Sequence, residues 1–292
     1  MKVFKVLDEY TRELVARKTS TKNLQRHHSA VRILTRHIGD LEHYELTKKN
    51  IRDYIRNRDV KPQTASRELD VLSSALNFCN NERIIDWSIF KFEKYKSPAR
   101  ATFLSRKDID ALLSECHEYH LRIWMLIALS TAARSGAILG LKCDKVNFVD
   151  SIIDFRDESI EGKHKPRSVI KMPEALRPYL EDAVSKSVSG YVVEKDGKPV
   201  KSIYYDCIRA AQRAGLKNVS PHTMRHTCAV HMVKNDVPIY EVSKYLGHKS
   251  IEITQKHYAK FSPDFMKKSS NVGSMLIPVS YTHLRAHETR SD

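Results

Sequence analysis

The sequence reads Pro221-His222-Thr223-Met224-Arg225-His226, then Leu246-Gly247-His248, and then His257-Tyr258. Within forty residues these segments place imidazole and guanidinium groups ahead of one tyrosine, and Arg134 supplies a second guanidinium upstream. Each segment alone is a weak signal, because H-x-x-R recurs at residues 287–290 and a tyrosine is usually a packing aromatic. The ordered set is specific, and it indicates both the fold and the chemistry.

Side chains of these types suit phosphoryl transfer that uses no metal. The transition state spreads negative charge over non-bridging oxygens, which cations placed in advance stabilise. Arg134 and Arg225 can each donate two parallel hydrogen bonds. His222 lies three residues before Arg225 and so shares its helical face, and His248 adds another donor. The Tyr258 phenol, whose ordinary pKa is about 10, is expected to be stabilised as phenolate among these cations and to attack phosphorus.

Length and charge limit the possible partners. The chain has 292 residues, enough for two modest domains, and its formal net charge of +15 predicts an anionic partner. Nucleic acid is the first candidate and an anionic membrane surface is the second. No apolar run is long enough to span a bilayer, and the N-terminus lacks a secretory pattern. The five cysteines form no C-x-x-C pair, which argues against a zinc ribbon or a disulfide framework and fits a reducing cytoplasm.

Residues 1–92 are predicted to be helical. Apolar residues repeat at helical spacing from the N-terminus, a second helix is stopped by Gly39, Thr47 can cap a third, and Pro62 opens a fourth. The faces opposite the apolar positions share one sign of charge and carry Lys22, Arg26, Arg32, Arg36, Lys48, Lys49, Arg52, Arg56, Arg58 and Arg67. Such a face is compatible either with phosphate contacts or with an ordinary solvated surface.

A second domain is predicted at residues 103–272, after a linker at 93–102 that lacks periodicity and contains a proline. Ser105 can cap its first helix, and the apolar stretch 121–131 predicts a buried helix. Short strands are expected at 146–148, 151–155 and 168–170, and helices resume near residues 174, 202, 223 and 239. The tail at 273–292 is either a C-terminal arm or a non-native extension, and its composition favours the latter.

The second domain resembles the tyrosine recombinases of the phage integrase family. The resemblance covers roughly residues 103–265 and is carried by the segments quoted at the outset together with Thr131-Ala-Ala-Arg134-Ser-Gly-Ala-Ile-Leu-Gly-Leu141 and Gly162-Lys163-His-Lys165. The N-terminal helices are similar, by pattern only, to the SAM-like core-binding domain of that family. The resemblance implies a mainly α fold with a small antiparallel β-sheet (α+β), in which the two domains close around duplex DNA as a C-shaped clamp.

The resemblance also implies an activity. A site-specific DNA recombinase of this kind cuts one strand to leave a 3′-phosphotyrosine and a free 5′-hydroxyl, and it rejoins the end to another strand without a metal or nucleotide cofactor. Arg134 and Arg225 would bind the scissile phosphate, His222 would assist proton movement, His248 would donate to a non-bridging oxygen, and Tyr258 would be the nucleophile.

The proton donor to the leaving 5′ oxygen is expected from the turn before a strand. Counting back from residues 169–170 favours Lys163 over Lys165. Lys165, Arg167, Lys48 and Arg67 are expected to contact DNA.

The implied partners are double-stranded DNA and further copies of the chain, as a homotetramer on two duplexes, with accessory DNA-bending proteins in some systems. The expected location is the bacterial cytoplasm, at the nucleoid. Phage or prophage integration and excision is the favoured role, while chromosome dimer resolution and DNA inversion stay open. A DNA-binding protein without catalysis and a type IB topoisomerase are the alternative functions.

Three features depart from the family pattern or suggest another chemistry. Many members carry an acid three residues after the first arginine, where this chain has Ala137. Tyr258 follows His248 by ten residues, one more than in many relatives, which a flexible connection would tolerate. His222 and His226 form part of an H-x-x-x-H pattern, but Thr223 stands where a zinc protease needs glutamate, so a metal site is not expected.

Overall fold

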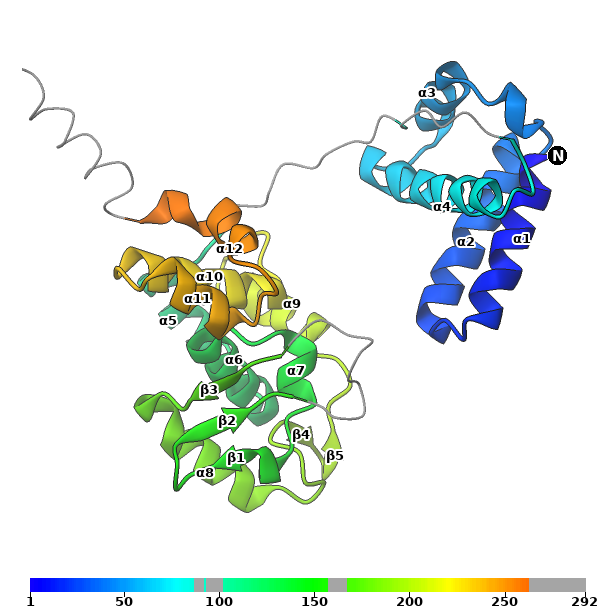
Figure 1. Ribbon diagram of the computed structural model, residues 1–292. Coiled ribbons are helices and arrows are strands. Elements are labelled where there is room, and N and C mark those ends of the chain that lie inside the picture. Colours follow the sequence, from blue (N-terminus) through cyan, green and yellow to red (C-terminus); the bar gives the residue numbers. More distant parts are fainter. Residues whose placement is uncertain (87–91, 93–101, 157–166, 263–292) are drawn as a thin grey trace, which may run out of the picture. The chain divides into compact units, whose positions relative to one another are not determined.

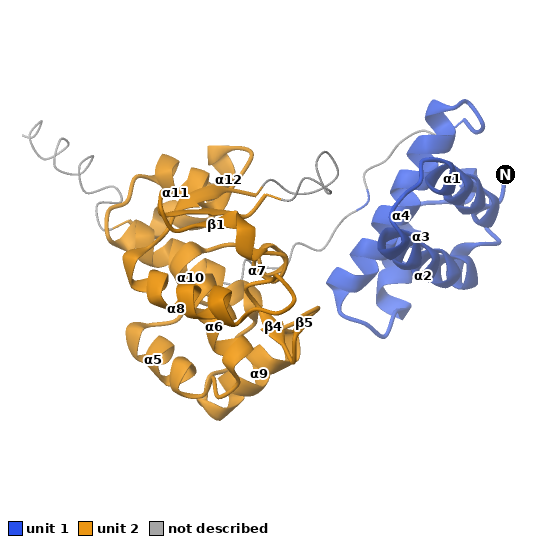
Figure 2. Ribbon diagram, turned by 90° about the horizontal axis from the view of Figure 1, so that it is seen from below, with its two compact units in different colours: residues 1–99 blue, residues 100–292 orange. Residues whose placement is uncertain are grey.

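The computed structural model describes residues 1–86, 92, 102–156 and 167–262. The chain divides into two compact units, an N-terminal unit of residues 1–99 and a C-terminal unit of residues 100–292, which Figure 2 shows in two colours. The division falls within the stretch where the linker is expected.

Four α-helices form the described part of the N-terminal unit (Figure 1). Its elements are α1 (Val3–Ala16), α2 (Thr21–Ile38), a 3-10 turn (His43–Glu45), α3 (Lys48–Asn57) and α4 (Pro62–Asn81). α1 packs against both α2 and α4, and Leu7, Leu34 and Leu69 are fully buried between them. Each such leucine contributes about 1.5–3 kcal/mol from burial, which outweighs the weak intrinsic stability of helices this short.

The predicted helix ends are largely correct. Thr47 caps α3 by accepting a hydrogen bond from the Asn50 N–H at 3.3 Å, and Pro62 occupies the first turn of α4. A glycine at the end of a helix usually adopts a left-handed conformation, but Gly39, which ends α2, has a φ of −63°. A Cβ at Gly39 would lie 2.4 Å from the Thr35 carbonyl oxygen, so the position needs glycine for space.

Arg58 does not belong to the outward basic face on which the sequence placed it. Its guanidinium donates to both carboxylate oxygens of Glu68, at 2.8 and 3.1 Å, and the Tyr54 hydroxyl donates to the same carboxylate at 2.5 Å. Glu68 is only 7% exposed. Arg58 therefore connects α3 to α4, while Lys48 and Arg67 remain exposed.

The C-terminal unit is built around one buried helix. Its elements are α5 (Arg106–Ser114), α6 (Tyr119–Thr131), α7 (Ser135–Leu139), β1 (Val146–Asn147), β2 (Ile152–Asp154), β3 (Val169–Lys171), α8 (Arg177–Lys186), β4 (Glu194–Lys195), β5 (Lys198–Pro199), α9 (Tyr204–Arg213), α10 (Pro221–Lys234), α11 (Ile239–Leu246) and α12 (Ile251–Tyr258). α6 packs against α7, α8 and α10, as Figure 1 shows, and Trp124 lies fully buried at its centre. The small antiparallel sheet has the order β1-β2-β3, with Ile153 opposite both Val146 and Ile170.

Three elements of the C-terminal unit differ from the sequence interpretation. α7 and the β4–β5 hairpin were not expected, although Asp196-Gly197, with φ values of 53° and 70°, is a common two-residue hairpin turn. The connection between His248 and Tyr258 is helix α12 over most of its length rather than a flexible link. The expected turn at 161–166 and tail at 273–292 lie outside the described residues. None of the helices in the described ranges has the length and apolar character needed to cross a bilayer.

Candidate active site

The end of α6 places Arg134. Ala132 adopts a left-handed conformation with φ of 51°, which ends the helix and redirects the chain into α7. The Ala133 N–H donates to Thr131 Oγ1 at 3.2 Å, and Arg134 then precedes the first residue of α7. The Arg134 side chain is half-buried, and burial followed by the charge of Arg167 lowers its pKa. Arg134 and Arg167 therefore lie near one another.

Arg225, on α10, joins three separate segments. Its Nη1 donates to the Ala132 carbonyl at 2.7 Å, and its Nη2 donates to the Leu246 carbonyl at 2.8 Å and lies 3.1 Å from His248 Nε2. The residue is only 4% exposed. Burial, and then the charge of Arg134, lowers its pKa to about 10, so the guanidinium stays protonated at neutral pH. The two arginines share one site, and the protein holds the second rigidly.

His248 has a defined tautomer in this arrangement. Arginine has no acceptor, so His248 Nε2 must accept from Arg225, and the proton of a neutral ring lies on Nδ1. Nδ1 donates to Thr254 Oγ1 at 2.8 Å, and Thr254 is fully buried on α12. Burial and the charges of Arg225 and Arg134 lower the pKa of His248 to about 4, so the ring is neutral at pH 7.

Tyr258 ends α12 and is only 5% exposed. Its ring packs in a small apolar cluster that includes Ala132, Cys228 and Leu246. Burial raises its pKa by more than the nearby Arg225 lowers it. The expectation that the cations stabilise a phenolate therefore does not hold for the protein alone, because desolvation is the larger effect.

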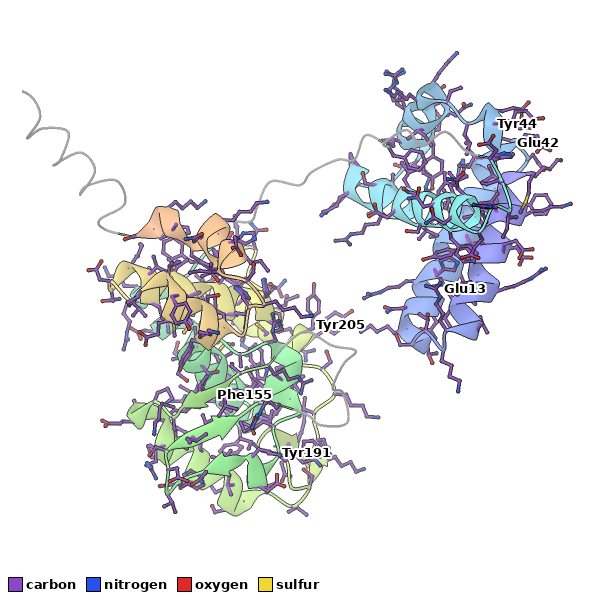
Figure 3. All side chains as sticks on the ribbon, in the orientation of Figure 1. Glu13, Glu42, Tyr44, Phe155, Tyr191 and Tyr205 are labelled. Atoms are coloured by element: carbon purple, nitrogen blue, oxygen red, sulfur yellow. The ribbon has the colours of Figure 1, made fainter. Side chains whose placement is uncertain are left out.

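The other expected site residues take different places. His222 is exposed in the first turn of α10, where Ser220 N donates to Thr223 Oγ1 at 3.0 Å, and its charge acts on His248. Arg167 lies beside Arg134 and contacts the carbonyl of Phe155, labelled in Figure 3, at 3.5 Å. Lys163 and Lys165 lie outside the described residues, and Lys48 and Arg67 belong to the N-terminal unit.

The structure thus brings Arg134, His222, Arg225, His248 and Tyr258 to one region. Ala137, at the position where many relatives have an acid, is buried in α7. Sequence reasoning missed Thr254 as a neighbour of the site and considered His226 only as part of a metal pattern. Thr254 precedes Tyr258 by one helical turn, and His226 follows His222 by one helical turn, so the helical spacing around the motif could have pointed to both. Across the described ranges, His, Cys, Asp and Glu side chains form no group of three that could hold a metal ion.

Replacing Thr254 with valine is expected to loosen His248 without changing the shape of the core. The variant removes the acceptor 2.8 Å from Nδ1 and leaves a buried N–H unpaired, which costs about 1–3 kcal/mol of unfolding free energy. If His248 acts on a phosphate, the rate of DNA cleavage should also fall about tenfold. Thr254→Ser keeps the hydroxyl and should retain the rate. Equal rates for the two variants would show that this hydrogen bond does not matter for the reaction.

Comparison with known proteins identifies the family of the chain. The description of the phage integrase family matches residues 102–263, more than half of the chain, and the chain belongs to that family. Tyrosine recombinase XerA of Thermococcus onnurineus is 27% identical over 210 residues, which are 65% of this chain and 72% of the relative. The integrase of Escherichia phage 186 is 24% identical over 232 residues, which are 76% of this chain and 63% of the relative. The chain also matches other tyrosine recombinases over less than two thirds of their length, among them XerA of Thermococcus kodakarensis, of which it covers 63%.

Solved structures show the same fold. A lambda integrase fragment, solved as a dimer bound to a COC′ core site, matches with a TM-score of 0.72 at 19% identity, covering 87% of this chain and 97% of that one. The Tn1549 transposon integrase in complex with transposon right-end DNA matches with a TM-score of 0.76 at 15% identity, covering 94% of this chain and 100% of that one. The predicted family and the mainly α fold with small antiparallel sheets are confirmed.

Proposed function

We propose that the protein is a site-specific DNA recombinase that cuts and rejoins strands through a 3′-phosphotyrosine. The observation that carries this proposal is the position of Arg225. Its guanidinium contacts the segment before Arg134, the end of α11 and His248, and its charge also acts on the Tyr258 phenol, where it opposes part of the rise in pKa that burial causes. Two guanidinium groups, two imidazoles and a phenol around one point form a site for a single phosphodiester.

In the proposed reaction the bound phosphate first changes the protonation of His248. Its negative charge offsets the positive potential of Arg134 and Arg225, and it therefore favours protonation of His248. A doubly protonated His248 can no longer accept from Arg225, so Nε2 donates to a non-bridging oxygen instead. The negative charge of the phosphate does not stabilise a phenolate, so the Tyr258 proton leaves as the oxygen attacks, and exposed His222 assists this proton movement.

The bond changes balance without a cofactor. The Tyr258 oxygen forms a bond to phosphorus, and the bond from phosphorus to the 5′ oxygen breaks. The leaving oxygen takes up a proton, which we assign to Lys163, with Lys165 as the alternative. Rejoining reverses these steps with a 5′-hydroxyl from another strand, so the energy of the original bond is kept in the phosphotyrosine.

The remaining basic residues are assigned to the DNA backbone. Arg167, beside Arg134, would contact a phosphate next to the scissile one, and Lys48 and Arg67 of the core-binding domain would contact phosphates elsewhere. Strand exchange needs two duplexes, so we propose a homotetramer, and a lambda integrase tetramer bound to a Holliday junction is among the structures with this fold. Phage or prophage integration and excision is the role proposed.

The function can be tested without knowing the target sequence. The protein is incubated with a library of nicked random duplexes in EDTA and denatured, and the DNA that remains attached is sequenced. We expect adducts to form in the chelator, with blocked 3′ ends, free 5′-hydroxyls and one shared sequence. Adducts at unrelated sequences together with relaxation of any plasmid would identify a type IB topoisomerase. Salt-sensitive binding without any adduct would identify a non-catalytic DNA-binding protein.

A further inference from the structure

His226 contains a buried nitrogen that has no hydrogen-bond partner. In the described part of the chain only two buried side-chain atoms are in this condition, Trp124 Nε1 in the core around α6 and His226 Nε2. Leaving a buried polar atom unpaired costs about 1–3 kcal/mol, and a native protein usually avoids it. Phenylalanine would fill an apolar position without that cost. The imidazole is therefore expected to have a partner in another state of the site.

The neighbour of His226 is the proposed nucleophile. The ring centroids of His226 and Tyr258 are 5.1 Å apart with the planes tilted by 37°, and Phe261 contacts the imidazole edge to face with centroids 6.2 Å apart. His226 follows Arg225 on α10, so its place is fixed by the same helix that holds the guanidinium. The imidazole thus contacts the proposed nucleophile and comes from the helix that carries Arg225.

The charges around His226 favour its neutral form. Burial, followed by the charges of His222 on α10, His257 on α12 and Lys260 in the turn after it, lowers the pKa of His226. A neutral imidazole has one nitrogen that accepts and one that donates. With Nδ1 protonated, Nε2 is an acceptor without a donor, and the nearest hydroxyl-bearing side chain in ring contact is Tyr258.

We propose that His226 is a positioning residue for the nucleophile: its ring supports the Tyr258 ring, and its Nε2 accepts a hydrogen bond from the phenol when the hydroxyl turns toward the phosphate. This inference rests on the proposed function. No proton is transferred in this step. The hydrogen bond fixes the O–H direction, so that a lone pair of the phenolic oxygen faces phosphorus before the attack begins. Misplacing a reacting atom by about 1 Å can cost on the order of 100-fold in rate.

Three substitutions of His226 distinguish the contribution of Nε2 from the contribution of the aromatic ring. His226→Phe keeps an aromatic ring against Tyr258 and removes both nitrogens. His226→Gln places an amide near the position of Nε2, whereas His226→Asn places one near Nδ1. His257→Phe is the matched control, because this exposed histidine is also in ring contact with Tyr258, with centroids 6.3 Å apart. The measurements are the single-turnover rate of adduct formation at saturating DNA, the Kd for DNA, and the melting temperature.

We expect His226→Phe to slow adduct formation by about 10- to 100-fold while the Kd for DNA is unchanged and the melting temperature does not fall. His226→Gln should restore most of the rate, His226→Asn should not, and His257→Phe should react like the wild type. A wild-type rate for His226→Phe, or equal rates for the Gln and Asn variants, would overturn the assignment of Nε2. If the wild type itself forms no adduct, the proposed function fails as well, so the two failures are distinguishable.

Discussion

Tyr258→Phe should abolish the covalent bond between protein and DNA. The substitution removes the only atom that can attack phosphorus in the proposed reaction, so no adduct should form even after long incubation with a nicked duplex. The ring remains in the cluster with Ala132, Cys228 and Leu246, and DNA binding and the melting temperature should therefore change little. The adduct is measured by denaturing electrophoresis, and the attached peptide by mass spectrometry.

Tyr245→Phe is the matched control for the loss of a hydroxyl. The Tyr245 hydroxyl donates to the Ser130 carbonyl at 3.2 Å in the same unit, so its removal costs about 1 kcal/mol of stability. Adduct formation should continue in this variant. A covalent adduct formed by Tyr258→Phe would show that another residue is the nucleophile, whatever the control does.

Arg225→Ala should have the second largest effect, and it should lower both activity and stability. Loss of a preorganised cation costs on the order of 100- to 1,000-fold in the rate of the chemical step. The change also leaves the buried carbonyls of Ala132 and Leu246 without donors, which costs roughly 2–4 kcal/mol of unfolding free energy. Adduct rates at saturating DNA and denaturant unfolding measure the two effects separately.

Arg225→Lys tests the need for the guanidinium shape. Lysine keeps the charge but cannot reach two carbonyls and a phosphate from one planar group, so activity should still fall about 100-fold. Arg209→Ala, which removes an exposed arginine of α9 paired with Asp206, should change stability by less than about 0.5 kcal/mol. Full activity in Arg225→Lys would mean that the residue acts only as a point charge.

Much of the fold could be read from the sequence because the helices have strong local signals. Thr47 and Pro62 each mark a helix start through a mechanism that acts within a few residues, and the structure confirms both. Elements whose local sequence does not clearly favour one type of secondary structure were harder to predict. α7 has only five residues. The segment after His248 has Ile251 and Ile253 two residues apart, a spacing that does not indicate a helix, although the segment forms α12.

The properties of the site could be predicted less fully than its members. The resemblance to the family implies that Arg225, His248 and Tyr258 lie near each other, but it carries no information on the burial of these side chains in this chain. The phenol is buried, so its pKa rises where the sequence led us to expect a stabilised phenolate, and the neutral tautomer of His248 depends on Thr254. Arg58 was assigned to a basic face because its partner, Glu68, lies on another helix. Such effects come from tertiary contacts that no local pattern encodes.

The hydrogen bonds of Arg225 also affect the order in which the protein matures on the ribosome. Domains generally fold as they are synthesised, starting from the N-terminal side. The helical unit of residues 1–99 can therefore form early. The hydrogen bond to the Ala132 carbonyl can form only after Arg225, 93 residues later, has been synthesised, and the hydrogen bond from Arg225 to the Leu246 carbonyl forms later still. The site around Arg225 is therefore assembled only after synthesis has passed α12, later than the helical unit of residues 1–99.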